Sequence, residues 1–247
     1  KDFREPAGQR EAIRQINNAG MDGIIVAGGD GSLTGAQKLV AKGVPVVGVP
    51  ASIDNDIFGT DTCIGVDTAL NTIVDAIDKI RDTASSHNRA FLVETMGRES
   101  GYLAIQAGIV TGAELVLIPE HNTPPEEVGV AIEEAYRRGK THAIIVVAEG
   151  YKPQALELGA RLEAMDTGFT TRTTILGHIQ RGGKPSPFDR LLATRFGVAA
   201  VQFLLAGQSN VMTAYNGSEI VPIAIDEVIS NKKNLSEEFI QMMQILA

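Results

Sequence analysis

The order of local patterns along the chain is the feature that most restricts its fold. Short apolar runs rich in Val and Ile alternate with segments of helical periodicity, and most runs end in Gly, Pro or an acid. Continuous apolar runs are typical of strands buried on both faces of a parallel sheet. Strands that alternate with helices indicate βαβ units and a mainly parallel sheet. The predicted strands are Gly23–Ala27, Val44–Val49, Phe91–Val93, Leu115–Ile118, Ala143–Ala148 and Thr174–Leu176.

Two of the helical segments show their signals clearly. In Val66–Arg81 the apolar residues keep i, i+3 and i+4 spacing, with charges on the other faces. Glu126–Arg138 follows two prolines, which favour a helix start, and ends at Gly139, which favours a helix stop. Pro187–Leu205 and Leu235–Leu246 are also predicted helices. No Pro/Ser/Gly linker divides the chain, so two domains would have to be interwoven.

Composition excludes several classes of protein. The 247 residues carry 22 basic and 30 acidic side chains, a net charge of −8, which disfavours a nucleic-acid binder. The single cysteine, Cys63, excludes an internal disulfide and a Cys-rich metal site, and fits a reducing, cytoplasmic location. No signal peptide is visible in residues 1–15. The longest uncharged stretch, residues 196–218, loses its apolar character after Ala206, so we expect no membrane partner.

The first cluster that suggests chemistry is Gly28-Gly29-Asp30-Gly31-Ser32, between a predicted strand and a predicted helix. Glycines let the backbone approach a polyphosphate, and the N-terminus of the following helix offers free N–H groups. A carboxylate beside phosphates is repulsive unless a cation lies between them, so Asp30 is a candidate Mg²⁺ partner. The plainer interpretation is an ordinary strand-to-helix turn.

The second cluster, Pro50–Asp56, follows the buried strand Val44–Val49. Ligands of open α/β sheets bind at the carboxyl ends of strands. Two negative charges at Asp54 and Asp56 would repel each other there unless a metal ion or a proton is bound. This suggests that one acts as a general base and the other lies near a metal. The competing interpretation is an Asx-type turn with solvated acids.

The third cluster consists of arginines and histidines that we place after strands or in Gly-containing loops, together with Glu149. Arginine suits bidentate phosphate binding. An isolated arginine is more often a surface residue, and a histidine alone is more often structural, but four such arginines are less easily dismissed. The other histidines show no metal-ligand spacing. The basic residues are Arg89, Arg98, Arg172, His178 and Arg181.

Together these segments resemble the phosphofructokinase family, along essentially the whole chain and in the same order. A GGDG loop alone is shared with NAD kinases and diacylglycerol kinases, whereas the IDND, MGR and GHIQRGG segments are not. The segments that carry the resemblance are Gly28–Ser32, Pro50–Ile57, Ser85–Arg89, Met96–Tyr102, Ala148–Gly150 and Leu176–Gly183.

The resemblance implies an α/β fold of two interwoven doubly wound domains, with mainly parallel sheets and an active site in the cleft between them. The nucleotide domain is expected at residues 1–65 and 180–230, and the sugar-phosphate domain at 66–179 and 231–247. The implied reaction is phosphorylation of the 1-hydroxyl of fructose 6-phosphate by MgATP, a step of glycolysis. The alternatives are a pyrophosphate-dependent enzyme with the same acceptor, and a catalytically silent chain or fragment that binds sugar phosphate.

The resemblance also implies a role for each matching residue. Asp54 looks like the base, Arg98 neutralises the transferred phosphoryl group, and Ser52 replaces a threonine that contacts this group. The acids that match magnesium-associated positions are Asp30 and Asp56, and Gly29, Gly31 and Ser32 complete the nucleotide loop. The residues that match the sugar-phosphate pocket are Asp56, Met96, Gly97, Glu149, His178 and Arg181, with Arg89 and Arg172 contributed by a neighbouring subunit.

Two further implications concern assembly and regulation. Arginines that cross an interface imply a homotetramer with shared active sites. Residues Arg81, Glu114, Arg138 and Lys140 match positions that line an allosteric phosphate-effector site. The sequence departs from the family in three ways. The opening strand with its own Gly-rich loop is absent before Lys1, Ala51 replaces the Gly or Lys found in relatives, and Ser52 replaces a threonine while keeping the hydroxyl.

Overall fold

The structure is a computed structural model that describes residues 3, 5–84 and 88–246. Residues 85–87, which belong to one motif segment and include His87, expected to be structural or at the surface, therefore lie outside the described residues. The chain divides into two compact units. Unit 1 comprises residues 1–52, 56–65 and 187–233, and unit 2 comprises 53–55, 66–186 and 234–247. Each unit is described by itself.

This division differs from the expected domain boundaries in detail. Residues 180–186 belong to unit 2, because the short 3₁₀ helix η2 (Gly177–Arg181) packs on the long helix α3 and the Ser186 amide donates to Thr68 Oγ1 at 3.0 Å. Residues 53–55 also group with unit 2, although the strand that precedes them belongs to unit 1.

Unit 1 is built on a four-stranded sheet in the order β1-β2-β7-β8. Strand β2 pairs in parallel with both β1 and β7, and β7 forms an antiparallel hairpin with β8. The strands are β1 (Ile24–Gly28), β2 (Val46–Pro50), β7 (Val211–Asn216) and β8 (Glu219–Ala224).

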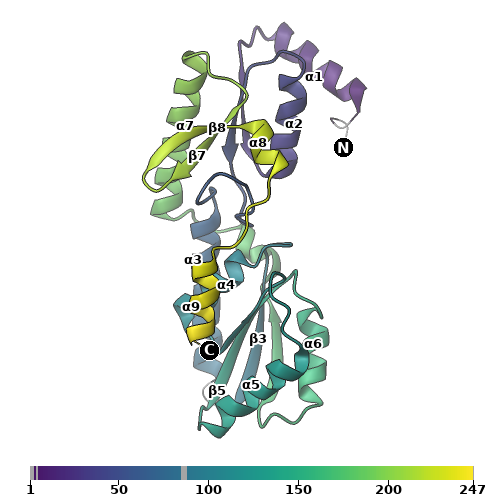
Figure 1. Ribbon diagram of the computed structural model, residues 1–247, viewed down its shortest axis with the longest axis vertical. Helices are drawn as coiled ribbons and strands as arrows, with labels where there is room; N and C mark the ends of the chain where they lie inside the picture. Colours follow the sequence, from purple (N-terminus) through teal and green to yellow (C-terminus); the bar gives the residue numbers. More distant parts are fainter. Residues whose placement is uncertain (1–2, 4, 85–87, 247) are drawn as a thin grey trace. The chain divides into compact units, whose positions relative to one another are not determined.

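Helices cover both faces of this sheet, as buried parallel strands require. Val47 and Val49 pack with Phe196 of α7, and the alternating position Gly48 faces α2, where an added Cβ would lie 2.6 Å from Leu33 Cδ2. Glycine at position 48 therefore lets α2 lie close to the sheet. The helices of this unit are α1 (Pro6–Asn18), α2 (Asp30–Val40), α7 (Pro187–Leu205) and α8 (Ile225–Ser230) (Figure 1).

Unit 2 contains a fully parallel sheet in the order β4-β5-β3-β6. Its strands are β3 (Arg89–Thr95), β4 (Leu115–Leu117), β5 (His142–Ala148) and β6 (Thr170–Ile175). Its α-helices are α3 (Val66–Ala84), α4 (Tyr102–Thr111), α5 (Pro125–Arg137), α6 (Ala155–Glu163) and α9 (Glu237–Leu246).

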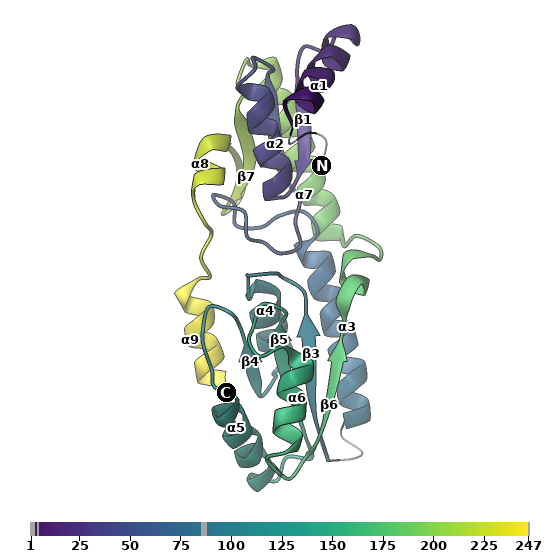
Figure 2. The ribbon, with the colours of Figure 1, turned by 90° about the vertical axis from the view of Figure 1, so that its right-hand side faces the viewer.

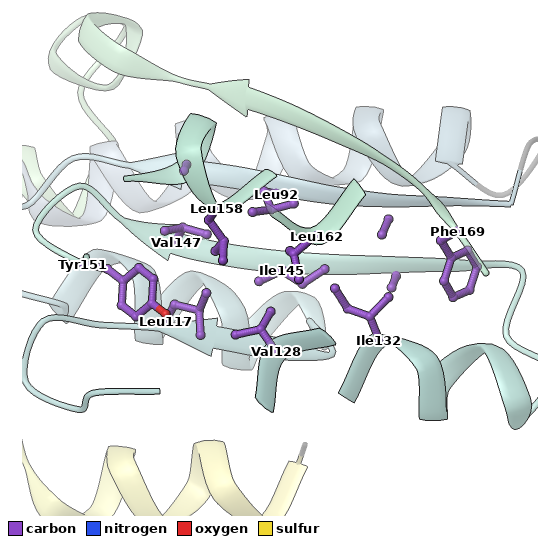
Figure 3. Close-up of a cluster of buried hydrophobic side chains, with 13 residues drawn as sticks. Leu92, Leu117, Val128, Ile132, Ile145, Val147, Tyr151, Leu158, Leu162 and Phe169 are labelled. Carbon is purple, nitrogen blue, oxygen red and sulfur yellow. The ribbon is translucent and has the colours of Figure 1, made fainter. Parts of the chain in front are cut away.

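Helices α5 and α6 cover one face of the unit 2 sheet, and α3 and α4 contact its strands as well (Figure 2). The core under α5 and α6 interleaves Leu92 and Ile145 from the two central strands with Ile132 and Leu158 from the helices (Figure 3). Tyr151 closes one end of this cluster, where its hydroxyl donates to Thr123 O at 2.5 Å. The rigid sheet fixes the ends of β3 and β5, from which the site loops leave.

The predicted α/β class with mainly parallel sheets is confirmed. The β7–β8 hairpin was missed, although Asn216-Gly217 is a strong turn signal between two apolar segments. Helix α4 was also missed, because most of its residues are buried and it lacks a polar face that would mark its period. No helix in the described ranges has both the length and the apolar character needed to cross a bilayer.

Candidate functional site

The carboxyl edge of the unit 2 sheet brings two site loops together. Strand β3 ends at Thr95 and strand β5 at Ala148, and the Glu149 amide donates to Thr95 O at 2.9 Å. The segments that begin with Met96 and with Glu149 therefore leave the sheet side by side. This is the edge at which ligands of parallel α/β sheets bind.

Glu149 holds the Met96–Arg98 segment, which we call the Arg98 loop, by its backbone. Its Oε1 accepts hydrogen bonds from Gly97 N at 3.2 Å and from Arg98 N at 2.6 Å. Both residues have positive φ, +143° for Gly97 and +54° for Arg98. A left-handed conformation costs a non-glycine residue about 1–2 kcal/mol, so these charge-assisted bonds help to hold an unfavourable backbone.

Gly150 gives the Arg98 loop its second constraint. A Cβ at this position would lie 2.2 Å from the Arg98 carbonyl oxygen and 3.1 Å from Pro119 Cγ. Only glycine therefore lets the two loops approach this closely. Local sequence explains the Gly97 turn, but this requirement for Gly150 arises from a contact between distant segments.

Arg98 lies opposite Asp54. Its Nε is 3.4 Å from Asp54 Oδ2, and the Asp54 side chain is 6% exposed whereas that of Arg98 is 69% exposed. Asn55, with φ +51°, turns the chain directly after the carboxylate. The result is a buried carboxylate that faces a largely solvated guanidinium, so one partner is fixed and the other can reach a ligand.

The turn that contains His178 and Arg181 lies beside the Arg98 loop. Gln180 lies between these two residues in the sequence and is almost completely buried. Its Oε1 accepts a hydrogen bond from Met96 N at 3.1 Å. Its Nε2 donates to Gly177 O at 3.0 Å. Sequence reasoning singled out His178 and Arg181 but missed Gln180. The available signal was a glutamine between two expected ligand residues in one short turn.

A half-buried acid, Glu94, also went unnoticed in the sequence. It lies on β3 and its pKa is raised, mainly by burial and also by the charge of Glu149, while the backbone N–H of Ala155 and the charge of Lys152 lower it. The carboxyl edge therefore carries a second acid close to Glu149.

In unit 1 the predicted glycine loop has the expected geometry. Gly28 ends β1, Gly29 is the N-cap of α2, and Asp30 is its first residue. An added Cβ on Gly28 would lie 2.3 Å from Ser32 Oγ, so Ser32 folds back over this glycine. A Cβ on Gly31 would meet nothing within 4 Å. Packing within the chain therefore requires Gly28 but not Gly31.

Ser52 lies against this loop, since a Cβ on Gly29 would be 3.6 Å from Ser52 Cβ.

The charges of Asp30 and Asp56 both affect the pKa of the Cys63 thiol. Burial raises the pKa of Cys63 to about 12, Lys233 opposes the rise, and the charges of Asp56 and Asp30 add to it. Both carboxylates are thus near one buried group of unit 1. No three acidic, histidine or cysteine side chains in the described part of the chain are arranged to hold a metal alone.

Two arginines do not lie where the sequence placed them. Arg89 begins β3 and Arg172 is inside β6, so neither follows a strand. The predicted strands Phe91–Val93 and Thr174–Leu176 began too late and left both arginines outside a strand, because both observed strands start with polar residues that lack an apolar pattern. Phe91 is paired with Arg172, which puts Arg89 and Arg172 on one face of the sheet. Arg89 is at the opposite end of β3 from the Arg98 loop, about 20 Å away at 3.3 Å per residue.

The four candidate effector residues lie near the amino ends of the unit 2 strands. Glu114, just before β4, accepts Ile144 N at 2.5 Å and pairs with Lys140 Nζ at 3.1 Å. Arg81, near the end of α3, donates to Thr111 O, and its Nε is buried with no partner among the described residues. Arg138 is the exposed C-cap of α5. The fold therefore provides basic side chains at this second edge.

The comparisons with known proteins agree with the motifs. The sequence model of a family described as phosphofructokinase matches residues 1–204. The chain belongs to the phosphofructokinase family. It is 49% identical to the "ATP-dependent 6-phosphofructokinase" of Thermotoga neapolitana over 248 residues, covering all of this chain and 77% of that protein. It is 47% identical to the protein of the same name from Brevibacillus brevis, covering 99% of this chain and 76% of the relative.

Solved structures confirm the phosphofructokinase fold. The phosphofructokinase of Saccharomyces cerevisiae superposes with a TM-score of 0.85 at 36% identity, over 93% of this chain and 35% of that one. A pyrophosphate-dependent phosphofructokinase of Marinobacter aquaeolei gives 0.80 at 20% identity, over 97% of this chain and 71% of that one. At 20% identity the second likeness shows the fold alone. The family predicted from the sequence motifs is confirmed.

Proposed function

We propose that this phosphofructokinase transfers a phosphoryl group from MgATP to the 1-hydroxyl of fructose 6-phosphate. The observation that carries the proposal is the Asp54–Arg98 pair beside Glu149, in a chain whose curated relatives are named ATP-dependent 6-phosphofructokinase. A buried carboxylate and an exposed guanidinium at one site can serve a hydroxyl acceptor and an anionic donor together. Phosphoryl transfer depends mostly on such positioning and charge neutralisation.

Within this proposal Asp54 accepts the proton of the sugar hydroxyl, and Arg98 neutralises charge on the transferred group. Ser52 offers its hydroxyl to the transferred group. The residues that bind the sugar phosphate are Met96, Gly97, Glu149, His178 and Arg181. Glu149 accepts hydrogen bonds from the Arg98 loop, and the turn that contains His178 is bonded to the same loop through Gln180. This arrangement supports the set.

The phosphoryl donor binds the N-terminus of α2 in the proposal. Gly29 and Gly31 present backbone N–H groups there, and the helix dipole favours an anion. Ser32, whose own N–H donates to Gly29 O at 2.9 Å, offers its hydroxyl. Asp30 and Asp56 would hold Mg²⁺, and Asp56 would also bind the sugar phosphate. Mg²⁺ commonly takes one or two carboxylates and completes its shell with water and substrate phosphates, which fits a chain without a full metal cluster in its described residues. Bound Mg²⁺ neutralises charge on the phosphates.

ATP is favoured over pyrophosphate as the donor by one structural detail. Gly31 is surrounded by open space, so the glycine leaves room for a ligand and is not needed for packing. Ala51 adds no positive charge that would compensate a bare pyrophosphate. A silent sugar-phosphate-binding chain is disfavoured, because both Asp54 and Asp30 are retained at the site.

The proposal extends to assembly, regulation and location. Arg89 lies at the far end of β3 from the Arg98 loop, which supports its use, with Arg172, in a neighbouring subunit's site within a homotetramer. The edge with Arg81, Glu114, Arg138 and Lys140 is proposed to bind a phosphate effector. A glycolytic reaction that consumes ATP, with one buried thiol, fits the cytoplasm.

A side-by-side assay tests the donor and the acceptor together. Phosphorylation of fructose 6-phosphate by the intact protein is measured with MgATP and with magnesium pyrophosphate, and kcat/KM is compared. We expect the higher kcat/KM with ATP. A higher value with pyrophosphate overturns the donor assignment, and no turnover with either donor overturns the proposed function.

A further inference from the structure

Gln180 is the most tightly held polar side chain of the η2 turn. It is 1% exposed, and both ends of its amide are hydrogen-bonded. The Met96 N–H can only donate and the Gly177 carbonyl can only accept, so Oε1 must face the former and Nε2 the latter. The amide therefore has one orientation.

Three consecutive backbone N–H groups of the Arg98 loop donate hydrogen bonds to side-chain acceptors. Gln180 takes the first, from Met96, and Glu149 takes the next two, from Gly97 and Arg98. These bonds hold a segment whose last two residues have positive φ. Loss of the first bond leaves a buried N–H unsatisfied at the start of that segment, and the loop can then relax.

Gln180 also lies in the same turn as His178 and Arg181. Its bond to Met96 therefore joins the turn proposed to bind the sugar phosphate to the loop that places Arg98 at 3.4 Å from Asp54. All these residues belong to unit 2. Among the described residues, no other side chain of the turn makes a hydrogen bond to the Arg98 loop, so this link is specific to the glutamine.

We propose that Gln180 is a positioning residue that keeps Arg98 aligned for phosphoryl transfer by holding the Met96 amide. The proposal rests on the proposed function, because it assumes that Arg98 acts on the transferred group. Gln180 acts through Arg98 and does not itself contact the reacting atoms. Removal of its amide lowers kcat more than it changes the KM for ATP.

The main test is a double-mutant cycle on the intact protein with Gln180→Met and Arg98→Ala. Methionine has similar volume but supplies neither hydrogen bond. We expect Gln180→Met to lower kcat about 10–100-fold, the scale of a misplacement of about 1 Å. In the Arg98→Ala background the same substitution should change kcat less than about threefold, because its effect passes through Arg98.

Gln106→Met is the matched control, since Gln106 lies on α4 of the same unit and its buried Nε2 has no hydrogen-bond partner among the described residues. It should leave kcat unchanged. Gln180→Asn repeats the cycle if the Met variant does not fold, because its shorter amide stays polar but withdraws the acceptor oxygen from Met96 N. Circular dichroism confirms the folded fraction before kinetics.

The proposal is overturned if the effects of the Gln180 and Arg98 substitutions on log kcat are additive. It is also overturned if a Gln180 variant is less stable but has an unchanged kcat. The wild-type assay with ATP and fructose 6-phosphate separates this failure from that of the proposed function. If the wild type turns over and the cycle is additive, only the role of Gln180 is lost. If the wild type is inactive, the proposed function fails first.

Discussion

The Asp54 carboxylate and the Arg98 guanidinium face each other at 3.4 Å, one buried and the other exposed. Burial fixes the acid, and the left-handed Arg98 backbone, held by Glu149, aims the cation at it. The pair thus combines a buried carboxylate with a solvent-exposed positive charge.

Asp54→Asn is expected to lower kcat about 10²–10⁴-fold while fructose 6-phosphate still binds, because the amide cannot accept the hydroxyl proton. Steady-state kinetics at saturating substrate measure this. Asp75→Asn, which removes an exposed acid of α3, is the control and should leave kcat unchanged. A loss of less than tenfold in the Asp54 variant removes it from the base role.

Gly31→Asp is expected to lower kcat/KM for ATP at least about 100-fold, close to 3 kcal/mol, through like-charge contact with the nucleotide phosphates. The variant should fold normally, because a Cβ at this position meets nothing within 4 Å. Gly31→Ala separates bulk from charge and should lose much less. Unchanged ATP kinetics in Gly31→Asp would place the nucleotide elsewhere.

Arg172→Ala is expected to raise the KM for fructose 6-phosphate and leave ATP binding intact, because a phosphate-clamping arginine contributes ground-state binding. If Arg172 serves a neighbouring subunit, mixing this variant with Asp54→Asn restores part of the activity through hybrid sites. The measurement is turnover at low fructose 6-phosphate after subunit exchange. Mixed tetramers without recovery contradict the shared site.

Gly150→Ala is expected to destabilise the fold by about 1–3 kcal/mol and to lower kcat, because its Cβ would press on the Arg98 carbonyl oxygen. Gly197→Ala is the matched control. Gly197 is an exposed residue of α7 with open space around it, so alanine should stabilise the protein by about 0.5–1 kcal/mol. Thermal unfolding and kcat are measured for both, and a neutral Gly150→Ala variant would contradict the close approach of the loops.

The Cys63 thiol is expected to resist alkylation in the native protein, because burial raises its pKa to about 12. At pH 9 the thiolate fraction falls about 500-fold below that of a thiol with pKa 9, and denaturant should restore rapid labelling. Since the folded pKa is raised, the stabilising effect of the neutral thiol is present below pH 9 and is lost as pH rises towards 12. Fast labelling without denaturant would show that the thiol is accessible.

The sequence alone determined the fold class and the segments that match the family. Apolar runs predicted the central strands, since a strand buried on both faces must be apolar along its length. The GGDG loop, the two acids after β2 and the GHIQR turn were visible for the same local reason: each places its functional groups within a few residues of one another. These motifs also identified the family.

Only the tertiary structure decided how those segments hold each other. Gln180 and Met96 are 84 positions apart and Arg98 and Glu149 are 51 apart, so no local pattern records their hydrogen bonds. The Gly150 requirement and the position of Arg89 and Arg172 on one face of the sheet likewise follow from strand register. Periodicity reports which residues are buried, whereas the packing of distant segments sets which buried residues meet.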